Sequence, residues 1–126
     1  MRLCNSRTCS IAALALVCGA SLVTATATSA RADEGRCLIA VKGRVFLKGR
    51  CNIEIQRGGS FTVGVSDRSR SEHFAYVALD GGADAAVGYW NGIEAESHAH
   101  EALGRLKRKG ACWSNRHARI CAWRRP

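Results

Sequence analysis

Hydrophobic and polar residues alternate over short stretches of this chain, and no long stretch follows the period of an α-helix. The alternation is clear at Ile53 and Ile55, and again at Phe61, Val63 and Val65. Side chains that alternate in this way point to opposite faces of a β-strand, so each stretch has one apolar face. Glycine-containing turn signals separate the stretches at short intervals. These signals are Lys42-Gly43, Lys48-Gly49, Gly58-Gly59, Asp80-Gly81-Gly82, Asn91-Gly92 and Lys109-Gly110.

The pattern predicts an all-β domain, arranged as a small antiparallel meander or a barrel. The predicted strands are 37–41, 44–47, 52–56, 60–65, 73–79, 85–90, 105–107, 111–114 and 119–123. Asn91-Gly92 is typical of a two-residue type I′ hairpin turn, which needs positive φ at both central residues. Only residues 94–103 fit a helical turn or two. The large side chains predicted for the core or for packing on disulfides are Trp90, Trp113 and Trp123.

The first 32 residues have the pattern of a secretory signal peptide. Arginines precede an apolar run over 11–23, which is shorter than the roughly 20 residues of a membrane-spanning helix. Small residues follow, and Ala30-Arg31-Ala32 fits a signal peptidase site, with Asp33 as the first mature residue. Cleavage after Ala30 is the alternative. The pattern predicts a periplasmic or secreted protein, with a single domain over 33–126 and no membrane span after cleavage.

Four cysteines follow the predicted cleavage site, at positions 37, 51, 112 and 121. An even number in a small exported chain predicts two disulfides, and four cysteines allow three pairings. We favour Cys37 with Cys51 and Cys112 with Cys121, because the members of each pair are close in sequence. A turn over 115–118 also puts Cys112 opposite Cys121 in a hairpin. Neither pair has the CxxC spacing of a zinc site.

The predicted mature chain is basic, with 16 Lys or Arg against 10 Asp or Glu and a net charge of +6. Its cations gather near the C-terminus. The candidate anion-binding residues are Arg105, Lys107, Arg108, Lys109, Arg116 and Arg119, followed by Arg124 and Arg125. Such a cluster favours an anionic envelope component, for example lipopolysaccharide or lipid head groups. A solvated surface that only keeps the domain soluble is the alternative, and the compartment argues against nucleic acid.

His98 and His100 are the candidate metal ligands. In an extended segment both rings project from the same face, and Glu94, Glu96 and Glu101 lie close along the chain. In a helix the two rings would lie about 200° apart and could not chelate one ion. The alternative is that both histidines only form local contacts, because a metal site needs three or four ligands.

No catalytic constellation is evident, and we expect neither an enzyme nor a bound cofactor. The segment around Ser60 lacks the second glycine of the G-x-S-x-G elbow, and the cysteines are explained by disulfides. We therefore expect a non-enzymatic binding or stress-related module of the envelope. The alternatives are an inhibitor of a secreted hydrolase of the lysozyme type, which would make a secreted protein the partner, and weak metal binding through His98 and His100.

Several segments together carry a resemblance to a known group of proteins. These segments are CLIAVKGRVFLKGRC, GGSF, HFAYV, GYWNG, SHAHEALGRL and GACWSNRHARICAW. In them the chain resembles a family of small secreted or periplasmic proteins of alphaproteobacteria that carries no assigned activity. The resemblance covers nearly all of the predicted mature chain. It implies export, both cysteine pairs and a compact domain, and it transfers no catalytic residue.

Overall fold

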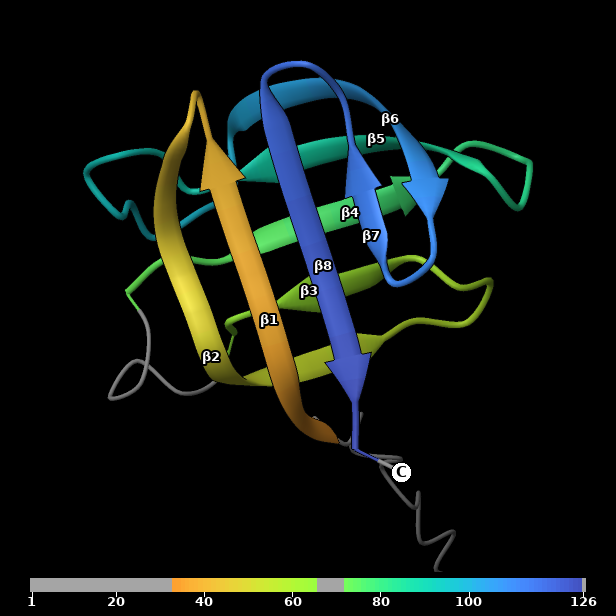
Figure 1. Cartoon of the computed structure of the whole chain (residues 1–126), viewed down its shortest axis with the longest axis horizontal. Coiled ribbons are helices and arrows are strands. Elements are labelled where there is room, and N and C mark those ends of the chain that lie inside the picture. The colour runs from red at the N-terminus through yellow and green to blue at the C-terminus, as the bar shows by residue number, and fades with distance from the viewer. Residues whose placement is uncertain (1–32, 66–71, 126) are drawn as a thin grey trace, which may run out of the picture.

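The computed structural model describes residues 33–65 and 72–125, and in them eight antiparallel strands close into a barrel (Figure 1). Each strand pairs with its neighbours in the chain, and β1 also pairs with β8. The strands are β1 (Asp33–Val41), β2 (Arg44–Ile55), β3 (Phe61–Val63), β4 (Ala75–Leu79), β5 (Ala85–Trp90), β6 (Glu101–Lys109), β7 (Cys112–Ser114) and β8 (Ala118–Arg124). The all-β prediction is confirmed. The predicted signal peptide over 1–32 lies outside the described residues.

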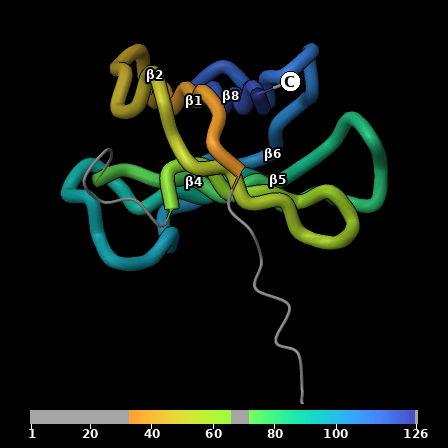
Figure 2. The backbone as a smooth tube through the Cα atoms, turned by 90° about the horizontal axis from the view of Figure 1, so that it is seen from below, coloured from red at the N-terminus to blue at the C-terminus, as the bar shows by residue number. Residues whose placement is uncertain are grey.

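Two layers of strands face each other across the barrel interior. In Figure 1, β1 and β8 run steeply across the front, and β3, β4 and β5 cross behind them. Figure 2 shows the same layers from below, with β2, β1 and β8 above β4 and β5. The long strand β2 belongs to both layers, because it pairs with β1 along most of its length and with β3 near its end. Among the described residues no helix is long and apolar enough to cross a membrane.

Alternation along the strands fills the interior with apolar side chains. In β1, the residues Gly35, Cys37, Ile39 and Val41 are buried, while Arg36, which lies between the first two, is exposed. The other strands contribute Ile53, Leu106 and Ile120 among the most deeply buried core side chains. Because a small domain has little apolar surface to bury, this single core carries most of the favourable free energy of folding.

Both predicted disulfides are present, and they lie on different faces of the barrel wall. Cys37 and Cys51 link β1 to β2, and both belong to the buried core. Cys112 and Cys121 face each other directly in the β7–β8 pair, with Cα atoms 4.0 Å apart. Their neighbours in the strands point inward, so strand alternation places this second disulfide on the outer face. The hairpin argument for its pairing is confirmed.

The two strands predicted over 44–47 and 52–56 are one strand. A break was expected at Lys48-Gly49, yet Lys48 pairs with Leu38 and Gly49 pairs with Cys37, so the ladder continues through the glycine. Gly49 has a φ of 133°, a conformation that a glycine adopts without a side-chain clash. The glycine here permits a distortion within β2 and does not end the strand.

The predicted hairpin turn at Asn91-Gly92 is wrong. β5 ends at Trp90 and β6 begins at Glu101, so a long loop replaces a two-residue turn. The side chain of Asn91 is buried, and its amide nitrogen donates to the carbonyl oxygens of Glu72 at 2.9 Å and Glu96 at 3.0 Å. Its Oδ1 accepts a hydrogen bond from the backbone N–H of Phe74 at 3.0 Å. Asn91 therefore anchors the loop to the segment before β4.

The predicted helical turn over 94–103 does not form either, since the described residues contain no helix. Residues 92–95 form a turn, and Ala95 has a φ of 52°, which lies outside the helical region. The last residues of the range, 101–103, belong to β6, which begins at Glu101. Of the predicted core tryptophans, Trp90 and Trp113 are buried, but Trp123 is 45% exposed. Strand β8 turns Trp123 outward, because Ile120 and Ala122 occupy the inward positions.

Candidate functional site

The outer face of the barrel between β6 and β8 carries the predicted cations in register. Lys107 of β6 is paired with Ser114 of β7, and Ser114 is paired with Arg119 of β8. Leu106 and Ile120, the neighbours of the two cations, are buried in the core, so Lys107 and Arg119 point outward. With neighbouring strands about 4.8 Å apart, the two backbones lie roughly 10 Å from each other.

The next row across the same face extends to the N-terminal strands. It starts at Lys109, passes the Cys112–Cys121 disulfide and Leu38, and ends at Lys48 of β2. Each member is paired with the next, so all of them lie on the outer face. The disulfide thus lies between two exposed lysines.

A third row lies beside the second, towards the end of β8. Arg36 of β1 is paired with Trp123 on one side and with Arg50 of β2 on the other. All three residues are exposed. We call the combined surface the basic outer face, and its cations are Arg36, Lys48, Arg50, Lys107, Lys109 and Arg119.

Among the described residues, carboxylates pair with cations at the margin of this surface. Glu34 forms ion pairs with Arg50 and with Arg125, the second at 3.6 Å, and Asp33 forms an ion pair with Arg124. The other cations of the basic outer face have no carboxylate partner among residues 33–65 and 72–125. These are Arg36, Lys48, Lys107, Lys109 and Arg119. Their positive charges therefore add to one field in front of the sheet.

The structure divides the predicted anion-binding cluster. Lys107, Lys109 and Arg119 belong to the basic outer face, and Arg105 forms an ion pair with Asp80 at 3.5 Å. Arg116 lies in the β7–β8 connection, where its Nε donates to the Nε2 of His117 at 3.1 Å. Arg108 lies apart from this surface, because alternation along β6 places it on the other face from its lysine neighbours.

Sequence reasoning missed Arg36, Lys48 and Arg50 as members of the site. They lie far from the C-terminal cations in the chain, and only the pairing of β1 with β8 brings them to the same surface. A signal was present in the sequence, because Arg36 and Arg50 directly precede Cys37 and Cys51, and Lys48 lies two residues before Arg50. The sequence left an open meander and a barrel as alternatives, and the closed barrel is the arrangement that brings these residues together.

The candidate metal ligands lie in the long loop between β5 and β6. The ring centroids of His98 and His100 are 5.2 Å apart, and both residues are exposed. Ser97 is within hydrogen-bond distance of His98, with 2.9 Å between Oγ and Nδ1. Within the part of the chain that the structure describes, no group of three His, Cys, Asp or Glu side chains is arranged to hold a metal. Metal binding through these two histidines stays a prediction.

The remaining polar candidates have structural partners. Ser60 Oγ accepts a hydrogen bond from the backbone N–H of Leu79 at 3.0 Å, which ties β4 to the segment before β3. Glu94 and Glu96 are exposed in the loop that Asn91 anchors, beside a small cleft of about 260 Å³. Comparisons with models of known protein families, with curated proteins and with solved structures found no match.

Proposed function

We propose that this protein is a non-enzymatic binding module of the bacterial envelope, periplasmic or secreted, that attaches to anionic surfaces through the basic outer face. The observation that carries the proposal is the set of five cations without carboxylate partners among the described residues, gathered on one side of the barrel. The ligand class is the phosphate-bearing surface of lipid head groups or lipopolysaccharide. The two disulfides support an oxidising environment outside the cytoplasm.

Two features of this surface suit a membrane interface. Trp123 is exposed beside Arg36, and tryptophan prefers the interfacial region, where its ring contacts apolar atoms and its N–H stays hydrated. The cations stand on paired strands that the Cys112–Cys121 disulfide and the core hold in place. Binding therefore requires little ordering of the backbone.

The charge sets an expected strength. A Lys or Arg near an anionic membrane contributes about 1 kcal/mol, so five such cations give about 5 kcal/mol. This free energy corresponds to a dissociation constant somewhat below 1 mM, typical of reversible attachment. The attraction must weaken as the Debye length falls from about 30 Å at 0.01 M salt to about 8 Å at 0.15 M.

The test compares two double variants that remove the same charge. Lys107→Gln with Lys109→Gln removes two cations of the basic outer face, and Lys42→Gln with Arg57→Gln removes two exposed cations from the connections between β1 and β2 and between β2 and β3. Co-sedimentation with phosphatidylglycerol vesicles at low salt measures the affinity. The first variant loses about 2 kcal/mol of binding free energy, so it should bind the vesicles about 30-fold more weakly than the wild type.

The control variant should bind within a few fold of the wild type, because its cations lie outside the three paired rows of the basic outer face. Phosphatidylcholine vesicles should bind none of the proteins. Equal weakening in both double variants would show that only net charge matters, and would refute a defined binding face. Absence of binding by the wild type at low salt would refute the proposed function itself.

A further inference from the structure

A second surface of the barrel has a different chemistry from the basic outer face. The loop between β2 and β3, the loop between β4 and β5, and the turn between β6 and β7 surround a cavity of about 810 Å³ at one end of the barrel. The first two loops extend on the right-hand side of Figure 1. The mouths of small β-barrels are common places for ligand sites, and this volume lies within the range of small-molecule pockets.

The inner part of this cavity's lining is apolar. Ile53, Phe61 and Trp113, which belong to the buried core, form its inner surface, and Leu79 and Ala122 complete it. At the mouth the backbone carries glycines instead of side chains. Around Gly58, Gly81, Gly82 and Gly110 an added Cβ would meet no atom within 4 Å, so the space in front of these residues is open.

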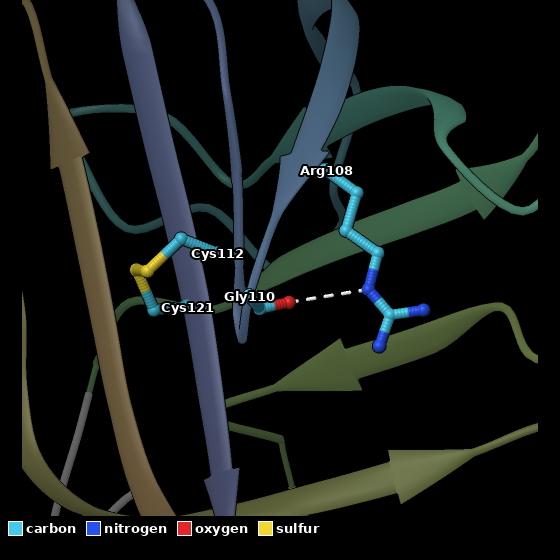
Figure 3. Close-up of a disulfide and its surroundings, with 4 residues drawn as sticks. All are labelled: Arg108, Gly110, Cys112 and Cys121. Carbon is cyan, nitrogen blue, oxygen red and sulfur yellow. Dashed lines mark hydrogen bonds between the residues drawn. A yellow bond between two sulfur atoms is a disulfide. The ribbon is translucent and has the colours of Figure 1, made fainter.

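One cation at the rim of the cavity is held in place with its charged end available. The Nε of Arg108 donates to the carbonyl oxygen of Gly110 at 3.1 Å, and its guanidinium carbon lies 5.9 Å from the centre of a Trp113 ring. Figure 3 shows the side chain extending away from the Cys112–Cys121 disulfide and bonded to Gly110. Its two terminal nitrogens have no partner among the described residues.

The other cation at the rim, Arg124, is already in an ion pair with Asp33. Of the two described cations at the rim, Arg108 is therefore the one that can receive a new anion. A guanidinium whose orientation is fixed by one hydrogen bond presents two parallel N–H donors, which match the two oxygens of a carboxylate.

We propose that this cavity binds a small amphiphilic carboxylate, with its hydrocarbon body against Ile53, Phe61 and Trp113 and its carboxylate on the terminal nitrogens of Arg108. The apolar part of the lining accounts for the body, and Arg108, the one arginine of the described lining without a carboxylate partner, accounts for the charge. The site goes beyond the proposed attachment to anionic surfaces, because Arg108 lies on the other face of β6 from Lys107 and Lys109.

The test measures binding of three probes to the oxidised protein, expressed from its full coding chain, by isothermal titration calorimetry. Octanoate carries both the apolar body and the charge, octanol carries the body alone, and acetate carries the charge alone. Octanoate should bind at a single site and at least about tenfold more tightly than either other probe, since a charge-assisted hydrogen-bond pair discriminates by that amount.

Variants locate the site. Arg108→Gln should weaken octanoate binding about tenfold or more, and Arg108→Lys, which keeps the charge and loses the paired donors, should weaken it less. Lys107→Gln is the matched control on the same strand and should bind octanoate within twofold of the wild type. Ala122→Leu extends a wall residue into the cavity and should reduce binding while Arg108 stays in place. Circular dichroism checks that each variant is folded.

Three results would overturn the proposal. The first is that the wild type does not bind octanoate. The second is that octanol binds as tightly as octanoate. The third is that Arg108→Gln and Ala122→Leu both leave the affinity for octanoate within twofold of the wild type. Vesicle binding by the basic outer face is unaffected by any of these results. Conversely, if the wild type bound octanoate through Arg108 but did not bind vesicles, the cavity site would be supported and the proposed function would be refuted.

Discussion

The two disulfides should contribute unequally to stability, because they close loops of different length and lie in different surroundings. The sharpest comparison uses two double variants, Cys37→Ala with Cys51→Ala and Cys112→Ala with Cys121→Ala. Replacing both members of a pair avoids a free thiol that could oxidise or exchange. Each variant keeps the other disulfide as an internal reference.

The magnitudes follow from sequence separation and burial. The separations are 14 residues for the first pair and 9 for the second, so the chain-entropy relation gives about 3.0 and about 2.6 kcal/mol. Cys37 and Cys51 are both 1% exposed within the core, and each lost sulfur there adds about 1 kcal/mol for the space it leaves. Cys121 is buried but Cys112 is partly exposed, so the second pair adds about half as much. We expect losses of about 5 and about 3.5 kcal/mol.

Urea denaturation followed by tryptophan fluorescence gives both free energies of unfolding, and the m-values report how far each unfolded chain expands. A difference of about 1.5 kcal/mol corresponds to roughly 6 to 12 °C in melting temperature for a domain of this size. If removing the second pair lowered the free energy of unfolding as much as removing the first, or more, the argument from loop length and burial would be refuted.

Two positions in the loops should be sensitive to small changes. Gly59→Ala should destabilise the protein by about 1 to 2 kcal/mol, because Gly59 has a φ of 94° and an added Cβ would lie 2.8 Å from Leu79 Cδ1. Gly82→Ala, with no positive φ and open space around it, should change stability by less than about 0.5 kcal/mol in the same urea titration. Asn91→Ala removes three hydrogen bonds from a buried site and should reduce the free energy of unfolding by about 2 to 4 kcal/mol. A loss below about 0.5 kcal/mol on denaturation would contradict the anchoring role of Asn91.

The features that depend on local sequence were predictable. Residues 85–90 lie between the glycine-containing signals Asp80-Gly81-Gly82 and Asn91-Gly92, and the structure has a strand with the same bounds. The Cys112–Cys121 pairing followed from the register of a short hairpin, since cysteines placed symmetrically about a turn must meet. The prediction of a hairpin turn at Asn91-Gly92 failed because a side chain there forms hydrogen bonds with residues distant in the sequence. Asn91 precedes glycine as in a tight turn, but its amide bonds to Glu72 and Glu96 and fixes a longer loop.

The candidate site was only half predictable for a related reason. The C-terminal cations were visible as a cluster, but the register of β6 separates Arg108 from Lys107 and Lys109, and sequence alone does not fix which face a strand presents. Arg36 joined the site through the pairing of β1 with β8, a contact between opposite ends of the domain. The cavity was not visible in the sequence, because three separate loops form its mouth.

The most direct test of the central claim measures two variants of β6 against two ligands. Lys107→Gln with Lys109→Gln should weaken binding to phosphatidylglycerol vesicles about 30-fold and leave octanoate binding within twofold. Arg108→Gln should weaken octanoate binding about tenfold or more and change vesicle binding by no more than a few fold. If the lysine variant bound vesicles as well as the wild type at low salt, the basic outer face would not be the attachment surface, and the account of function would be wrong.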